Sequence, residues 1–124
     1  MTVGGILAAV DGVKPNRFDR AQKIRWLAEL DGTIWQEVIG THEGTGEDSF
    51  RPYDEGTEDG QELLVPEPYS MVYRWWLEAQ MDLANGELGK YQNSMQLYNA
   101  SYLSFMDWYN RTHMPKQRVT HFRL

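Results

Sequence analysis

The side chains that most often carry chemistry are few in this 124-residue chain, and they form no catalytic or metal-binding pattern. There is no cysteine, which excludes disulfides, thiolate metal sites and thiol catalysis. The three histidines, His42, His113 and His121, do not have the spacing of the helical two-histidine motif that binds zinc. None of the five serines lies in the Gly-x-Ser-x-Gly turn that exposes a nucleophilic hydroxyl. We therefore expect no catalytic residue, no metal site, no cofactor and no enzymatic activity.

Carboxylates are concentrated in one glycine-rich stretch, residues 41–68, which holds nine acidic residues and a single basic one. Calcium takes oxygen ligands of this kind, but the spacing of a calcium-binding loop fails, because Gly56 and Val65 would stand at ligand positions. We interpret the stretch as a long acidic loop in contact with solvent. Phe50 and Tyr53 are placed to anchor its middle.

Basic residues gather in two places, the segment 14–25 and the acid-free tail 112–124. The formal net charge of −6 disfavours a general polyanion binder. We interpret the basic groups as helix-surface charge and as pairing between subunits. A basic tail and an acidic loop on one chain predict that neighbouring copies meet head to tail, a contact that closes into a ring when the rotation allows it. A DNA-binding module that uses both basic regions remains an alternative.

Four helices must position these groups. Apolar spacing predicts them over residues 2–13, 19–39, 69–85 and 87–111. Thr2 is a candidate N-cap of the first helix, and either Asp19 or Asn16 can cap the second. Gly40 is a candidate C′ residue, and Pro68 suits a first helical turn. The short turn at Gly86 predicts that the last two helices form an antiparallel hairpin.

The acidic residues of the predicted helices are interpreted as helix surface, namely Glu29, Glu37, Glu78, Asp82 and Asp107. Asp31 is the exception, because it falls on the apolar face of its helix beside Gly32, where we expect a kink. The predicted fold is all-α: a single domain, residues 1–124, with a small bundle of about four helices, a C-terminal αα-hairpin and a long acidic loop between the second and third helices.

Aromatic residues make up 13% of the chain and include five tryptophans. A heptad seam runs along the longest predicted helix, through Leu88, Tyr91, Met95, Tyr98, Tyr102, Phe105 and Tyr109. Four helices in so small a chain are not expected to cover every indole, so we expect copies of the chain to cover one another. The candidate interface residues are Trp75, Trp76, Trp108, Phe50, Tyr53, Arg111, Lys116, Arg118, Phe122 and Arg123.

No apolar run approaches the roughly 18 residues that span a bilayer. The apolar stretch near the N-terminus is not preceded by the basic residues of a secretion signal. We therefore expect neither a secreted protein nor a membrane partner.

Three stretches together resemble a known family. They are Val13–Asn16 followed by 22–32, then 62–69, and then 85–87 with 91–95 and 108–115. The combination is similar to that of small proteins encoded in the structural gene clusters of tailed phages and prophages, called head–tail connector or adaptor proteins.

The resemblance implies a non-enzymatic component of the virion neck, assembled in the cytoplasm of the bacterial host. Such proteins are helical, form homo-oligomeric rings, and dock between the portal protein and later neck or tail proteins. DNA passes through the ring only as cargo, and an acidic lumen would let it slide because like charges repel. Another phage structural role, such as tail completion or an assembly chaperone, is the nearest alternative.

Overall fold

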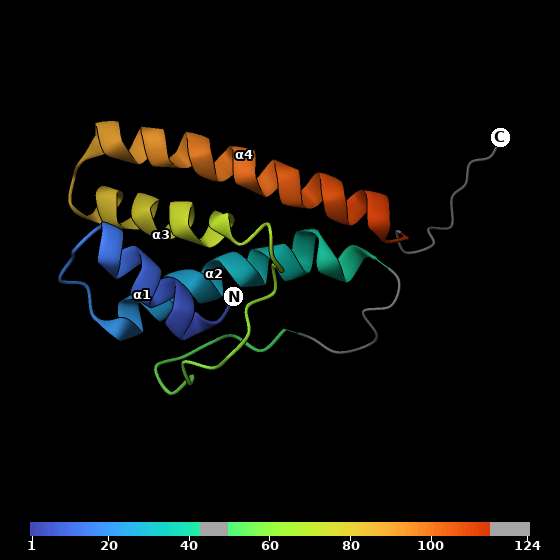
Figure 1. Cartoon of the computed structure of the whole chain (residues 1–124), viewed down its shortest axis with the longest axis horizontal. Coiled ribbons are helices and arrows are strands. Elements are labelled where there is room, and N and C mark those ends of the chain that lie inside the picture. Colours follow the sequence, from blue (N-terminus) through green and yellow to red (C-terminus); the bar gives the residue numbers. More distant parts are fainter. Residues whose placement is uncertain (43–49, 115–124) are drawn as a thin grey trace.

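The computed structural model describes residues 1–42 and 50–114, and in these ranges the chain is all-α. It has four α-helices and one 3₁₀ turn: α1 (Val3–Val13), α2 (Arg20–Glu37), η1 (Ile39–Thr41), α3 (Met71–Ala84) and α4 (Leu88–Thr112). The predicted fold, a small helical bundle with a C-terminal antiparallel hairpin, is confirmed (Figure 1).

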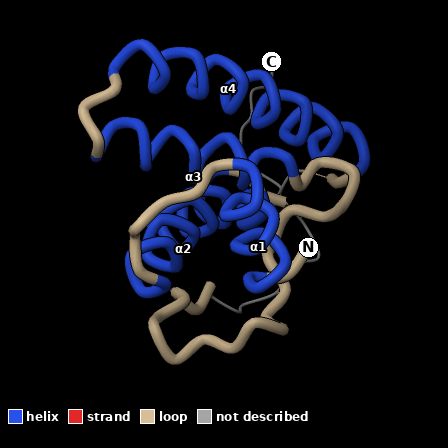
Figure 2. The backbone as a smooth tube through the Cα atoms, turned by 60° about the vertical axis from the view of Figure 1, so that its left-hand side comes forward, coloured by secondary structure: helices blue, strands red, loops and turns tan. Residues whose placement is uncertain are grey.

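Helix α3 is the central element of the bundle. Helix α4 lies along one side of α3, whereas α1 and α2 lie on its other side, and both views show this order (Figures 1 and 2). One hydrophobic core joins the helices. Its largest fully buried side chains include Tyr73, Phe105, Ile24, Leu27 and Leu30. The layers therefore place α1 and α4 on opposite outer sides of the molecule.

The starts of the first two helices follow local sequence signals. The Thr2 hydroxyl accepts a hydrogen bond from the Gly5 amide at 3.0 Å, and the Asp19 carboxylate accepts one from the Gln22 amide at 2.8 Å. Thr2 is thus confirmed as an N-cap, and of the two candidates for the second helix it is Asp19, not Asn16, that caps α2. The prediction for Gly40 is wrong. Helix α2 ends at Glu37, and Gly40 lies inside the 3₁₀ turn instead of following the helix in a left-handed conformation.

The hairpin of α3 and α4 turns at Gly86, the only described residue with a positive φ, 74°. Its tight turn is closed by hydrogen bonds from the Asn85 amide to the Met81 carbonyl and from the Glu87 amide to the Asp82 carbonyl. At the other end of α3, the prediction for Pro68 is wrong. Pro68 precedes the helix, which begins only at Met71.

The heptad seam of α4 faces α3, but it is buried unevenly. Tyr98, Phe105 and Tyr109 are buried, and Tyr91, Met95 and Tyr102 are half-buried. Leu88, the first seam residue, is 60% exposed because it lies in the first turn after the hairpin bend. The apolar residues of α4 outside the seam also differ: Met106 and Trp108 pack against the core, whereas Leu97 and Leu103 remain exposed.

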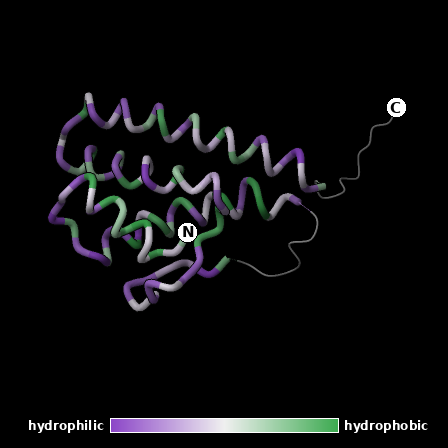
Figure 3. The backbone as a smooth tube through the Cα atoms, viewed as in Figure 1, coloured by the Kyte–Doolittle hydropathy of each residue, from purple (hydrophilic) through white to green (hydrophobic). Residues whose placement is uncertain are grey.

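The described part of the acidic loop is anchored to the bundle through its apolar residues. Tyr53, Leu63 and Val65 are buried and belong to the core, while the acidic side chains between them are exposed. An isolated antiparallel bridge between Thr2 and Glu62 ties the loop to the start of α1. Figure 3 shows the resulting pattern, in which green apolar positions lie on the inward sides of the helices.

Candidate functional site

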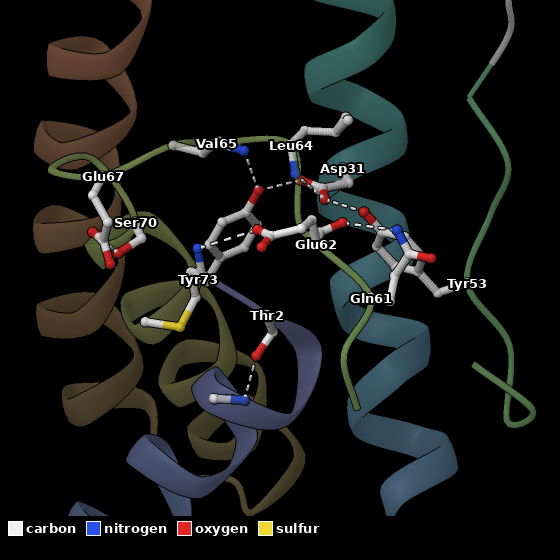
Figure 4. A network of polar contacts seen from close by, with 12 residues as sticks. Thr2, Asp31, Tyr53, Gln61, Glu62, Leu64, Val65, Glu67, Ser70 and Tyr73 are labelled. Atoms are coloured by element: carbon white, nitrogen blue, oxygen red, sulfur yellow. Dashed lines mark hydrogen bonds and ion pairs between the residues drawn. The ribbon is translucent and has the colours of Figure 1, made fainter. Parts of the chain in front are cut away.

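A buried carboxylate, Asp31, lies at the junction of α2, the loop and α3 (Figure 4). Its Oδ2 accepts hydrogen bonds from the Tyr53 hydroxyl at 2.6 Å and from the Leu64 amide at 3.1 Å. Its Oδ1 accepts one from the Tyr73 hydroxyl at 2.7 Å, and that hydroxyl in turn accepts a hydrogen bond from the Val65 amide at 2.7 Å. We call these five residues the Asp31 network.

The Asp31 network joins segments that are far apart in the sequence. Burial raises the pKa of Asp31, while the hydrogen bonds from the two tyrosines and from the Leu64 amide lower it and leave a net rise. Burial and the nearby carboxylate raise the pKa of both Tyr53 and Tyr73. Three donors therefore converge on both carboxylate oxygens, and the network holds the loop against α2 and α3.

The sequence predicted a kink in α2 beside Asp31. Helix α2 continues through Asp31 and Gly32 as one helix and ends at Glu37. The polar residue on the apolar face is accommodated because the two tyrosines and the loop amide supply its hydrogen bonds. The sequence marked Asp31 as unusual, but its partners come from segments that no local pattern connects to it.

A second buried carboxylate, Asp82, was predicted at the helix surface, and that prediction is wrong. Asp82 is 1% exposed, pairs with Lys14 Nζ at 2.5 Å, and accepts a hydrogen bond from the Ser94 hydroxyl at 3.2 Å. The contact joins the end of α1 to both helices of the hairpin. The flanking residues gave no consistent signal, since Met81 is buried and Leu83 is 46% exposed.

The other acidic residues of the helices lie closer to solvent. Glu29, Glu37 and Asp107 are exposed, as predicted. Glu37 accepts a hydrogen bond at 3.2 Å from the hydroxyl of Tyr102. Glu78 is half-buried and pairs with Arg74 at 2.6 Å, four residues earlier on α3.

The three predicted indole anchors are half-buried. The Trp76 indole donates a hydrogen bond to the Trp26 carbonyl at 2.8 Å and packs against Tyr98. The guanidinium of Arg74 lies over the Trp75 ring, 4.5 Å from its centre. Trp108 stacks on Tyr69 with 5.1 Å between ring centres. Of the remaining tryptophans, Trp26 is buried and Trp35 is half-buried, so the bundle leaves part of four indoles uncovered.

The remaining predicted interface residues fall into three groups. Tyr53 is buried in the Asp31 network, and Phe50 packs edge-on against it with 5.2 Å between ring centres. These two residues anchor the loop, as predicted, and little of Tyr53 is left for a partner. Arg111 is exposed near the end of α4. The others, Lys116, Arg118, Phe122 and Arg123, lie outside the described residues, as do most of the tail and the acidic positions 43–49.

An aromatic cluster closes the bundle at the end of α4. The rings of Tyr109 and His113 stack with 3.7 Å between their centres, and His42 meets the Tyr109 ring edge-on at 4.7 Å. The Nδ1 of His42 lies 2.6 Å from the Val38 carbonyl and therefore donates to it. The cluster fixes the end of α4 against the turn that follows α2.

Three of the five basic side chains in segment 14–25 are held by acids of the same chain. Besides the pair of Lys14 with Asp82, Lys23 is buried and pairs with Asp11 at 2.9 Å. Arg20 binds Asp59 at 2.8 Å and also donates to two loop carbonyls. The cluster thus serves largely to join α1, α2, α3 and the loop.

Within residues 1–42 and 50–114, no group of three or more histidine, aspartate or glutamate side chains is placed to hold a metal ion. In the same ranges, no helix is both long and apolar enough to cross a membrane. Comparison of the chain with protein-family models, with curated proteins and with solved structures found no match.

Proposed function

We propose that this chain is a non-enzymatic assembly protein of a tailed phage, a head–tail connector that forms an oligomeric ring in the neck of the virion. Its partners would be other copies of itself, the portal protein and the neck or tail proteins added later. The proposal starts from the three sequence stretches that resemble the connector family. It places the working protein in the virion after assembly in the cytoplasm of the host.

One structural observation supports an assembly role in particular. Among the described residues, the longest helix, α4, packs chiefly on α3, and the rest of its surface exposes Leu97 and Leu103. Four indoles are also left partly uncovered. Apolar and aromatic groups on the outside of a small bundle are typical of a subunit that other subunits cover.

The stretches that carry the resemblance also meet in space. Asp31, from the first, accepts a hydrogen bond from the Leu64 amide of the 62–69 stretch. Lys14, also from the first, pairs with Asp82, which lies outside the three stretches but accepts a hydrogen bond from Ser94 of the third. Their side chains therefore hold the fold together, which favours a shared architecture over a shared catalytic site. The ion pairs of Lys14, Arg20 and Lys23 within the chain weigh against the DNA-binding alternative, because they occupy much of the basic cluster.

The test of this proposal is assembly with the portal protein. We expect the purified chain to form rings visible by electron microscopy and to bind the portal protein encoded beside it. Truncation after Thr112 should prevent assembly and leave the four helices formed by circular dichroism, because it removes the tail and, of the described aromatic cluster, only His113. A full-length chain that binds DNA at moderate salt but neither forms rings nor binds the portal would overturn the proposal.

A further inference from the structure

The outer face of α4 has an unusual composition for an exposed helix. Residues 91–106 contain no charged side chain at all. The exposed members of this stretch are small, apolar or amide-bearing: Gln92, Asn93, Gln96, Leu97, Asn99, Ala100, Leu103 and Ser104. Leu97 is 40% exposed and Leu103 is 52% exposed. Depletion of charge, more than bulk hydrophobicity, distinguishes the core of a protein interface from ordinary surface.

Other exposed parts of the described chain contrast with this face. The outer side of α2 exposes Arg25, Glu29 and Glu37, and the loop exposes a series of carboxylates between Asp54 and Glu62. A charged partner face would lose the hydration of its charges against α4 without gaining an ion pair there. The occupant that fits α4 is therefore a surface that is itself uncharged.

The same chain has a second surface of this kind, on the outer side of α1. Its exposed residues are Gly5, Ala8, Ala9, Asp11, Gly12 and Val13. The one charged member, Asp11, is bound by Lys23 at 2.9 Å. Val13 is 57% exposed, and nothing lies within 4 Å of the position where Gly12 would carry a Cβ. Small side chains allow the backbone of another helix to approach closely, so that a larger residue such as Leu103, one turn from Ala100 on α4, fits against them.

We propose that the outer face of α4 binds the outer face of α1 in a second copy of this chain. The two faces match in lacking net charge, and they differ in side-chain size, since the α4 face carries Leu103 and amide side chains and the α1 face carries alanines and glycines. Helix α1, with 11 residues, is about 16 Å long, whereas the uncharged stretch of α4 extends about 24 Å. The whole of α1 can therefore lie along α4.

The position of the two faces determines what this contact builds. Because α1 and α4 lie on opposite sides of α3, their outer faces are two separate surfaces of each copy (Figures 1 and 2). Such a head-to-tail contact repeats, and it gives a ring if the rotation closes or a filament if it does not. The contact between copies is inferred from the two surfaces. Only the expectation that the copies close into a ring rests on the proposed function.

Cysteine cross-linking tests the contact directly, because the natural chain has no cysteine. Ala8 and Ala100 are both exposed, one on each face. In the full-length double variant A8C/A100C, a short bifunctional maleimide should produce a ladder of covalent oligomers. Neither single variant should go beyond a trace of dimer. The matched control A8C/E29C moves the second cysteine to the charged outer side of α2 and should give no ladder.

A charge variant provides the second measurement. Ala100→Glu introduces a carboxylate into the uncharged face and should make the chain monomeric in sedimentation velocity at concentrations where the wild type associates. The control Gln36→Glu adds the same charge at an exposed position of α2 and should associate as the wild type does. Circular dichroism shows whether each variant keeps its helices.

Several outcomes would overturn the inference. They are a wild type that stays monomeric up to millimolar concentration, a ladder no stronger than that of the control, or full dimerisation of A100C alone, which would mean that α4 meets α4. Rings without the ladder reject this inference and keep the proposed function. A ladder from a protein that does not bind the portal keeps this inference and rejects the proposed function.

Discussion

At the scale of single residues, the Asp31 network shows how a buried charge is tolerated in a small core. Two tyrosine hydroxyls and one amide donate to the carboxylate, and Tyr73 also accepts from the Val65 amide. The tyrosines are therefore not equivalent, although each makes one hydrogen bond to Asp31. Tyr73 is fully buried and satisfies two groups, whereas Tyr53 satisfies one.

This difference predicts unequal effects of removing the two hydroxyls. Tyr73→Phe leaves both Asp31 Oδ1 and the Val65 amide without a partner, and it should lower the free energy of unfolding by about 2–4 kcal/mol. Tyr53→Phe leaves Oδ2 its bond from the Leu64 amide and should cost about 1 kcal/mol. Urea unfolding followed by circular dichroism measures both. Equal losses would show that the Val65 amide finds another partner.

The raised pKa of Asp31 predicts a dependence of stability on pH. A carboxyl group with a higher pKa in the folded than in the unfolded state stabilises the fold most when protonated, and this contribution is lost as the pH rises from the unfolded pKa through the folded one. Asp31→Asn removes the titration. The difference in unfolding free energy between wild type and this variant should therefore decrease as the pH rises through that range.

The control for this pH measurement is Glu29→Gln, which changes an exposed carboxyl group on the same helix. Its unfolding free energy should follow that of the wild type at every pH. A difference between wild type and Asp31→Asn that grows with rising pH would mean that the hydrogen bonds outweigh burial and that the pKa of Asp31 is lowered.

At the scale of the elements, the start of α1 is held by the loop. The amides of Val3 and Gly4 donate to the carbonyls of Gln61 and Asp59, both at 2.9 Å. A Cβ at Gly4 would lie 2.6 Å from the Cβ of Asp59, whereas a Cβ at Gly12 would meet nothing. The two glycines occupy the same helix but differ in what surrounds them.

We therefore predict opposite effects of the same substitution in α1. Gly12→Ala should stabilise the protein by about 0.5–1 kcal/mol, because alanine favours the helix. Gly4→Ala should destabilise it by about 1–3 kcal/mol, because the loop must move away from the helix. Thermal unfolding of the two variants in parallel measures both effects. Stabilisation by both would show that the loop near Asp59 adapts without cost.

The elements also show what a sequence can predict. The helices were predicted because their apolar periodicity and their local signals at Thr2, Asp19 and Gly86 act within a few residues. The end of α2 before Gly40 and the start of α3 after Pro68 were predicted wrongly, because helix boundaries are the part of a helix that local signals determine least.

The candidate site was harder to predict than the helices. The partners of Asp31 are 22 to 42 residues away along the chain, and no periodicity connects them. Lys14 and Asp82 likewise come together only when α1 packs beside the hairpin. The sequence indicated that Asp31 was exceptional, because it is a polar residue on an apolar helix face. It also indicated that Phe50 and Tyr53 would anchor the loop, because they are aromatic residues in a polar segment. Neither conclusion requires knowledge of the partners.

At the scale of the whole molecule, two different contacts could join the copies, and they differ in how their strength depends on salt concentration. The sequence predicts a contact between the basic tail and the acidic loop, which ion pairs would hold. The contact that we propose from the structure joins the uncharged faces of α4 and α1 instead. Exposed ion pairs weaken as the ionic strength rises, whereas burial of uncharged surface does not depend on charge screening.

We predict that association of the full-length chain persists at high salt. Sedimentation velocity should give the same distribution of oligomers at about 0.1 M and about 1 M sodium chloride, although the Debye length falls from about 10 Å to about 3 Å over this range. The α4 variant A100E should be monomeric at both salt concentrations. The opposite result would be dissociation of the wild type as salt is added, together with dissociation at low salt after truncation at Thr112. Those two observations would show that the tail and the acidic loop hold the copies together, and that the uncharged faces of α1 and α4 do not.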